Sequence, residues 1–312
     1  MPRIFNASDL PIVDGKIYHL NLCAEDLADK IIIVGDPDRV PRIASQHLKN
    51  IRCDVFHRGL RTITGEHIDS GTRLSITTSG MGGPSTEIVL NEIHILKSVD
   101  LSSRRALADP KKVAIVRVGS SGGVHSDVQL GDAFVSEYAV GLDNSGLFYD
   151  VPLREKELRV VEERVSCAIN SATPSTARFA GRIHPFAAKA APQLTLALMD
   201  SAKKLNKRCF CGITVSNAGF FAAQGRDVSG ISPTLNDIDQ ALAGLGEVLP
   251  GLRITNFEME AALLLHFMGG NGHFAATICA AIANRALNTF TKDAAADVDS
   301  ATEIAIAALV RF

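Results

Sequence analysis

"VAIVRVGSSGGV", residues 113 to 124, begins like a buried strand and then runs through five small residues. Arg117 lies inside its apolar part. An ionised side chain inside a strand destabilises the fold unless an opposite charge meets it. Arg117 therefore needs a partner that its own strand does not supply. That partner is either a carboxylate of the protein or an anionic ligand, and this stretch alone leaves both open.

The strand pattern of this stretch recurs along the chain and predicts an α/β fold. Similar runs rich in Val, Ile and Thr are "KIIIVGD" (30–36), "RLSITTSG" (73–80), "DAFVSEYAV" (132–140), "CFCGITVSN" (209–217) and "HFAATICAAIANR" (273–285). Helical patterns lie between several of them, as in residues 82–96. Residues 296–312 predict a last helix with Asp299 or Ser300 as its cap. Strands alternating with helices indicate a mostly parallel sheet covered by helices.

The bulk composition is that of a soluble globular protein with a small-molecule partner. The 312 residues are 46% hydrophobic and 21% charged, and 32 basic residues stand against 34 acidic ones. This balance, with no basic stripe, argues against nucleic acid as a partner. No run approaches the ~20 apolar residues of a membrane span, and the first residues lack a signal-peptide pattern. We therefore expect no membrane partner and a cytoplasmic location.

The six cysteines are scattered along the sequence. This spacing predicts reduced thiols in the core and argues against a metal site or disulfides. Cys209 and Cys211 are the one close pair, and no second pair completes a tetrahedral ligand set. We therefore expect no metal.

The chain shows no internal repeat and no low-complexity linker, so residues 1–312 are predicted to form one domain. The mixed stretches 100–111, 170–193 and 229–252 are interpreted as insertions. The segment after Gly225 is the best candidate for a mobile flap, since "SGISPTLND" breaks regular structure.

Glycine-rich turns are expected at the ends of three strands, in "VGDPDRV" (34–40), "TSGMGGPST" (78–86) and "RVGSSGGV" (117–124). None matches a P-loop or the dinucleotide fingerprint, so ATP and NAD have little support. Arg39 and Arg117, with the hydroxyls of Ser120 and Ser121, would suit a phosphate. For Arg39 the alternative is a solvated residue at a helix start.

Two further stretches carry polar groups that are hard to place in a core. In "NFEMEAALLL" (256–265), Glu258 and Glu260 either cap a helix or bind a sugar diol, with Met259 beneath the ring. In "GFFAAQGRD" (219–227), Gln224 presents a donor and an acceptor while Arg226 presents donors. This pair matches the donor and acceptor edge of uracil.

The ordered set "GDPDRV", "TSGMGGPST", "RVGSSGG", "QLGD", "FFAAQGR" and "NFEMEAA" resembles the nucleoside phosphorylase family with a uridine phosphorylase type of base pocket. The likeness runs from "YHLNL" to "AIANR". It implies a single three-layer α/β/α domain whose central mixed sheet is partly closed into a barrel. It also implies reversible phosphorolysis of uridine to uracil and ribose 1-phosphate in pyrimidine salvage. Inorganic phosphate is then a co-substrate, and no cofactor is expected.

The resemblance also assigns roles to individual residues. Its phosphate site falls on Gly35, Arg39, Arg117 and Ser120, with Arg58 of the neighbouring subunit. Its ribose site falls on Glu258, Met259 and Glu260, with His19 of the neighbour, and its base site falls on Phe220, Gln224 and Arg226. The catalytic groups are Arg117, Arg226, Gln224 and Glu260. Arg117 would then pair with substrate phosphate.

The chain also departs from the family pattern. Gly59 replaces a glutamate that helps some relatives hold a metal ion between subunits. Asn217 replaces the aspartate with which purine-specific relatives protonate the base. Sites shared between subunits imply a homo-oligomer, and the longer stretches 100–111 and 170–193 favour a dimer over a hexamer.

Other functions remain open from the sequence. They are a purine nucleoside phosphorylase or a nucleoside hydrolase on the same fold, and a catalytically silent nucleoside-binding protein.

Overall fold

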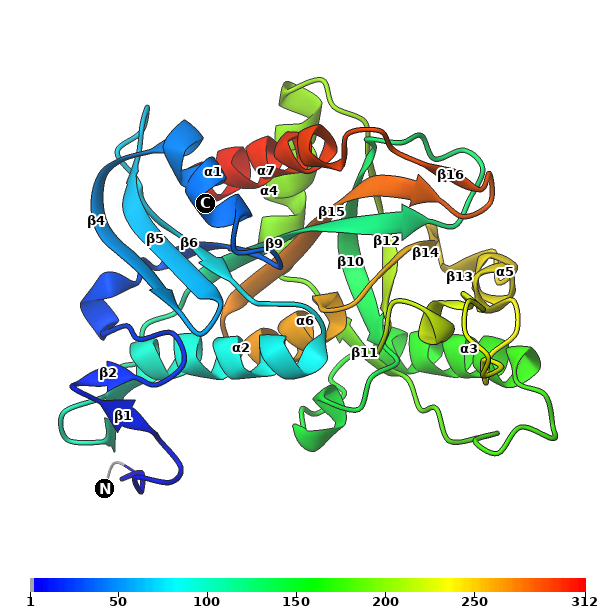
Figure 1. Cartoon of the computed structure of the whole chain (residues 1–312), viewed down its shortest axis with the longest axis horizontal. Helices are drawn as coiled ribbons and strands as arrows, with labels where there is room; N and C mark the ends of the chain where they lie inside the picture. Colours follow the sequence, from blue (N-terminus) through cyan, green and yellow to red (C-terminus); the bar gives the residue numbers. More distant parts are fainter. Residues whose placement is uncertain (1–2) are drawn as a thin grey trace.

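The computed structural model describes residues 3–312 as a mixed α/β arrangement (Figure 1). Its strands are β1 (Ile12–Val13), β2 (Lys16–Ile17), β3 (Lys30–Val34), β4 (Leu48–His57), β5 (Leu60–His67), β6 (Arg73–Thr78), β7 (Val99–Asp100), β8 (Arg105–Ala106), β9 (Ala114–Gly123), β10 (Ala133–Gly141), β11 (Phe186–Lys189), β12 (Cys209–Ser216), β13 (Glu247–Leu249), β14 (Leu252–Glu258), β15 (Phe274–Asn284) and β16 (Thr289–Phe290). Its α-helices are α1 (Arg39–His47), α2 (Gly83–Ser98), α3 (Lys156–Ala172), α4 (Pro192–Lys204), α5 (Ile238–Ala243), α6 (Ala261–Gly270) and α7 (Ala294–Arg311).

Five strands of the largest sheet form a closed ring. The order β14, β12, β10, β15, β9 returns to its start because Gly122 and Gly123 of β9 pair with Phe257 and Asn256 of β14. The ring is mixed: β12 is parallel to both of its neighbours, whereas β10 and β15 are antiparallel. The expected mixed, barrel-like sheet is confirmed.

The rest of the sheet extends from the ring, and helices cover it on both sides. Beyond β9 follow β3, β6, β5 and β4 in that order. Helices α1, α4 and α7 lie on one side of the sheet, and α2, α3 and α6 lie on the other (Figure 1). The expected three-layer α/β/α architecture is therefore confirmed.

The central strand β9 is longer than the sequence predicted. All five small residues after Val118 belong to it, so the glycine turn expected there is wrong. Gly122 and Gly123 pair with β14 on one side and with β15 on the other, which holds the backbone extended. A Cβ on Gly123 would come within 2.9 Å of Val128. Small residues thus let β9 close the barrel, where larger ones would clash.

The other predicted strands are present, and one helix start differs from the prediction. Helix α7 begins at Ala294, and its N-cap is Asp293, which accepts a hydrogen bond from the Ala296 amide at 3.0 Å. The prediction of a cap at Asp299 or Ser300 is wrong, because both residues lie beyond the first turn of the helix.

The three stretches interpreted as insertions carry regular structure. Residues 100–111 complete the β7–β8 hairpin, and 170–193 contain the end of α3, all of β11 and the start of α4. Residues 229–252 contain α5 and β13. Their origin as insertions in one domain and the mobility of the segment after Gly225 stay predictions.

Candidate functional site

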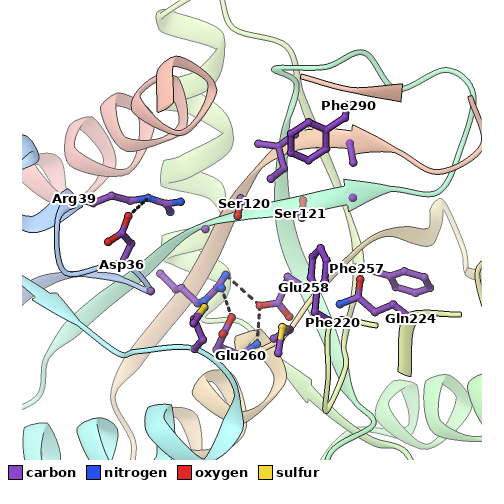
Figure 2. Close-up of a pocket in the computed structure, with 18 of the residues that line it drawn as sticks. Asp36, Arg39, Ser120, Ser121, Phe220, Gln224, Phe257, Glu258, Glu260 and Phe290 are labelled. Atoms are coloured by element: carbon purple, nitrogen blue, oxygen red, sulfur yellow. Dashed lines mark hydrogen bonds and ion pairs between the residues drawn. The ribbon is translucent and has the colours of Figure 1, made fainter. Parts of the chain in front are cut away.

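A cavity of about 470 Å³ opens where the barrel strands meet the loops that follow them (Figure 2). Most of the residues predicted for the site line this single cavity. They are Gly35, Arg39, Arg117, Ser120, Phe220, Gln224, Arg226, Glu258, Met259 and Glu260. The turn after β3, strand β9, the loop after β12 and the junction of β14 with α6 contribute these residues. Segments that are far apart in the sequence thus meet at one site.

Arg117 is buried between two carboxylates. Its guanidinium contacts Glu258 Oε2 at 3.1 Å and donates a hydrogen bond to Glu260 (Figure 2). It also donates to Cys279 Sγ at 3.2 Å. Burial disfavours the charge of Arg117, but Glu260 and Glu258 outweigh it and raise the pKa of the guanidinium. The internal ion pair that the sequence left open is therefore present, and Arg117 lines the cavity as well.

Gly119 makes room for this arrangement. A Cβ at Gly119 would lie 2.2 Å from Arg117 Nη1. Any other residue at this position would push the guanidinium away from its carboxylates, because a non-bonded carbon does not approach a nitrogen so closely.

Glu258 holds the start of α6. Its Oε2 accepts hydrogen bonds from the amides of Glu260 at 2.8 Å and Ala261 at 2.9 Å, and Ser216 Oγ donates to its Oε1. The capping interpretation is therefore confirmed for Glu258. Burial raises the pKa of this carboxyl, and the charges of Arg117 and Glu260 act on it in opposite directions.

Glu260 makes no cap with its side chain, although it occupies the N-cap position of α6. Its Oε1 accepts a hydrogen bond from the Gly82 amide at 2.6 Å, and its Oε2 accepts from Arg117. The carboxylate thus ties α6 to the glycine turn before α2 and lines the cavity between them.

Arg39 is a second arginine that lines the cavity near Arg117. Arg39 begins α1, and its Nε lies 3.8 Å from Asp36 Oδ2. Burial lowers the pKa of the Arg39 guanidinium, and the positive charge of Arg117 lowers it further, although Asp36 opposes the change. This end of the cavity thus presents two guanidinium groups that can donate to an anion.

The other end of the cavity presents an amide and a guanidinium. Arg226 donates to Gln224 Oε1 at 2.7 Å, and its Cζ lies 4.0 Å from the centre of the Phe220 ring. Gln224 is buried, whereas Phe220 is 49% exposed, so the phenylalanine is no core residue. A planar base with donor and acceptor atoms on one edge fits between such groups.

His19 and Arg58 do not line the cavity of their own chain. Arg58 lies at the tip of the β4–β5 hairpin, whereas His19 follows β2 and lies beside that hairpin, with its Nδ1 2.7 Å from Glu92 Oε1. His57 Nδ1 is 3.0 Å from the His19 carbonyl oxygen, and Arg58 donates to the Tyr18 hydroxyl at 3.3 Å. Arg58 and Gly59 both have positive φ, as the two central residues of a tight hairpin turn do.

Asn217 also lies outside the cavity lining. Its backbone N–H donates to the Glu258 carbonyl at 2.8 Å, and its side chain is fully buried.

Several cavity residues were not predicted from the sequence. Phe290 comes from the short strand β16, which pairs with β15 next to Ala283. Figure 2 shows Phe290 and Phe220 on opposite sides of Ser121. Met81 is 83% exposed at the mouth. A single phenylalanine in a two-residue strand or a single methionine in a loop carries no pattern that marks it as part of a site.

Within residues 3–312, no helix is long and apolar enough to cross a membrane. The same residues contain no group of three or more His, Cys, Asp or Glu side chains placed to hold a metal ion. All six cysteines are free, but Cys167 is exposed, so they are not all core thiols as expected. Burial raises the pKa of Cys279 to about 12, so beside Arg117 it is a neutral thiol.

The sequence model of the phosphorylase superfamily matches residues 29–312, which include every residue of the cavity. The chain belongs to the phosphorylase superfamily. It is 32% identical to a uridine phosphorylase of Thermococcus kodakarensis over 89% of this chain and 81% of that one. It is 27% identical to the uridine phosphorylase of Escherichia coli over 87% of each chain.

A solved structure has the same fold. It is a nucleoside phosphorylase of Trypanosoma brucei described as showing uridine phosphorylase activity, with a TM-score of 0.84 and 27% identity. The match covers 97% of this chain and 98% of that one. A DeoD-type purine nucleoside phosphorylase of Bacillus velezensis is 31% identical, but over only 38% of this chain and 44% of its own. The phosphorylase resemblance drawn from the sequence is confirmed.

Proposed function

We propose that the protein is a uridine phosphorylase that converts uridine and phosphate reversibly to uracil and ribose 1-phosphate. One observation carries the proposal: a single cavity has two arginines at one end and the Gln224–Arg226 pair at the other. Between them lie the carboxylate of Glu260 and the side chain of Met259. When phosphate and uridine react, the phosphate, the ribose and the pyrimidine lie in that same order.

The geometry supports catalysis by placed charges. Phosphate held by Arg39, Arg117 and Ser120 attacks C1′ of the ribose as the glycosidic bond breaks. Glu260 binds the ribose and stabilises the positive charge that develops on it. Negative charge on the departing uracil is stabilised by the N–H donors of Arg226 and Gln224. Such interactions strengthen as charge develops, so they favour the transition state over the ground state.

Arg117 connects the phosphate end with the ribose end. Its guanidinium has five N–H donors, and its contacts with Glu258, Glu260 and Cys279 use at most three of them. Arg117 can therefore hold Glu260 in place while it contributes to the phosphate. The ion pair and the phosphate contact, which the sequence presented as alternatives, are compatible in this arrangement.

A charge count supports a site shared between two subunits. Near the phosphate end, Arg39 and Arg117 supply two positive charges, whereas Asp36, Glu258 and Glu260 supply three negative ones. A phosphate anion needs further positive charge there. Arg58 lies on the surface of its own chain, where it can reach a neighbour's cavity, and His19 lies beside it. We propose a homodimer in which each subunit completes the other's site.

The remaining expectations belong to the same proposal. The reaction belongs to pyrimidine salvage. It uses inorganic phosphate as a co-substrate and needs no organic, redox or metal cofactor. Free thiols in all six cysteines support a cytoplasmic location, where thiols stay reduced.

Comparing uridine with inosine tests the choice of base. We expect uridine to be cleaved and inosine to be left intact, because Asn217 cannot protonate a purine and the Gln224–Arg226 pair matches uracil. Phosphorolysis of both nucleosides at comparable rates would contradict the pyrimidine assignment and favour the purine alternative.

A further inference from the structure

Arg285 lies directly after β15, behind the base end of the cavity and outside its lining. Its amide donates to the Gly123 carbonyl at 2.8 Å, which fixes its backbone to the barrel strand β9. Its guanidinium reaches the loop after β12 and donates to the carbonyl oxygen of Gln224 at 2.8 Å. A rigid strand thus holds the backbone of a base-site residue through one side chain.

Asp239, in the first turn of α5, holds that side chain in turn. Its Oδ2 accepts from Arg285 Nε at 3.2 Å and from Arg285 Nη2 at 3.0 Å. The side chains of Arg285 and Asp239 are only 15% and 19% exposed. An ion pair shielded from water is screened less than a surface pair, so it restricts the guanidinium more strongly.

The loop that Arg285 holds has little else to fix it. It consists of one 3-10 turn, Ala222–Gln224, closed by Gly225 in the left-handed conformation. Phe220 and Phe221, which precede this turn, are about half exposed. Arg226 donates to Gln224 Oε1, so any movement of Gln224 is passed on to Arg226. The position of both base-site side chains therefore depends on the tether.

We propose that Asp239 and Arg285 are positioning residues that hold Gln224 and Arg226 in the geometry that binds the base. Neither residue touches the substrate. Asp239 orients Arg285, Arg285 fixes the Gln224 carbonyl, and α5 and the base-site loop consequently move together. The role in base binding rests on the proposed function, whereas the tether itself can be measured without any nucleoside.

The kinetic test replaces Asp239 with asparagine, which keeps the size of the side chain and removes its charge. We expect the KM for uridine to rise about tenfold while the KM for phosphate stays within about twofold, because only the base end is disturbed. Asp239→Glu, which restores the charge, should recover part of the loss. The matched control is Glu303→Gln, which breaks the distant Lys207–Glu303 pair (2.5 Å) and should leave both constants unchanged.

An unchanged KM for uridine in a folded Asp239→Asn variant would overturn the inference while leaving uridine cleavage by the wild type intact. Equal losses for uridine and phosphate would overturn it as well, because they would indicate general destabilisation.

A second measurement does not depend on the substrate. Amide hydrogen exchange should quicken in residues 219–226 of Asp239→Asn, where the Gln224 amide donates to the Phe221 carbonyl, and stay unchanged in residues 256–265. Unchanged exchange in 219–226 would overturn the tether. If the wild type failed to cleave uridine, the proposed function would fall, and the exchange result would still decide whether Asp239 holds the loop.

Discussion

At the scale of single residues, the need of Arg117 for a partner could be predicted, but the partner's identity could not. A buried guanidinium in an apolar strand requires an opposite charge in any protein, so this need can be predicted without the structure. Glu260 is 143 residues away from Arg117 in the sequence, and the closed barrel brings the two together. Glu258 could be expected to cap a helix, but its contact with Arg117 depends on the same closure.

Glu260→Ala tests the ribose contact. We expect kcat/KM to fall by roughly 10- to 100-fold or more, because a charged hydrogen bond in a closed site contributes ~1.5–3 kcal/mol. Steady-state kinetics would measure the loss, and circular dichroism would check that the variant is folded. Near-normal activity in a folded variant would reduce Glu260 to a structural partner of Arg117 and Gly82.

Gly119→Ala tests the space beside Arg117. The new methyl would meet the guanidinium at 2.2 Å, so Arg117 must leave its carboxylates, and we expect activity to fall by about tenfold or more. The comparison is Gly122→Ala, whose methyl meets nothing nearer than 3.6 Å and should cost much less. Similar kinetic losses in the two variants would show that the geometry of Arg117 is not the cause.

At the scale of elements, runs rich in Val, Ile and Thr located β3, β6, β9, β10, β12 and β15, but β4, β5 and β14 were not predicted and the end of β9 was misjudged. Gly, Ser and Gly in succession usually mark a turn. In β9 they continue the strand, because the barrel bends there and pairs the same residues on two sides. The difference depends on neighbours that arrive from distant parts of the chain, and no local pattern records them.

Two histidines between α2 and β15 should make stability depend on pH. His273 Nδ1 accepts from the Val113 amide at 3.2 Å, and His273 Nε2 lies 3.0 Å from His94 Nδ1. Burial, with a smaller contribution from His94, lowers the pKa of His273 to about 4. The folded state therefore keeps His273 neutral, whereas the unfolded state takes up a proton near pH 6.5.

The stability that neutral His273 gives the folded state is complete above pH 6.5 and is lost as the pH falls towards 4, by up to about 3 kcal/mol. Thermal melting between pH 7.5 and 4.5 measures it. His273→Asn, which keeps an acceptor for Val113, should flatten the profile, whereas the exposed His184→Asn should not. An unchanged slope in His273→Asn would show that other groups cause the acid loss.

At the scale of the whole molecule, the three layers follow from the alternation of strands and helices, and the mixed barrel was expected from the family resemblance. The sheet order could not be predicted from periodicity, because β9 lies between β3 and β15, which are far from one another in the sequence. Burial patterns record which face of a strand is covered and not which strand lies beside it.

Sharing of sites between subunits predicts complementation. Arg58→Ala and Glu260→Ala should each have strongly reduced activity alone, because every site of either dimer carries a lesion. After subunit exchange, each mixed dimer has one site with both lesions and one with neither. About a quarter of the wild-type activity should return, since half of the dimers are mixed and half of their sites are intact.

Exchange itself is followed with two affinity tags. Proven exchange without recovered activity, or a fully active monomer, would contradict the shared site. Arg58 would then act within its own chain or not at all.

The central claim is that phosphate, held by Arg39 and Arg117, breaks the glycosidic bond of uridine. The most direct measurement follows uracil and ribose 1-phosphate released from uridine, with and without inorganic phosphate. We predict equal amounts of the two products when phosphate is present, and neither product without it. Uracil released with free ribose in the absence of phosphate would identify a hydrolase, and uridine bound without turnover would identify a binding protein. Either result would contradict the account.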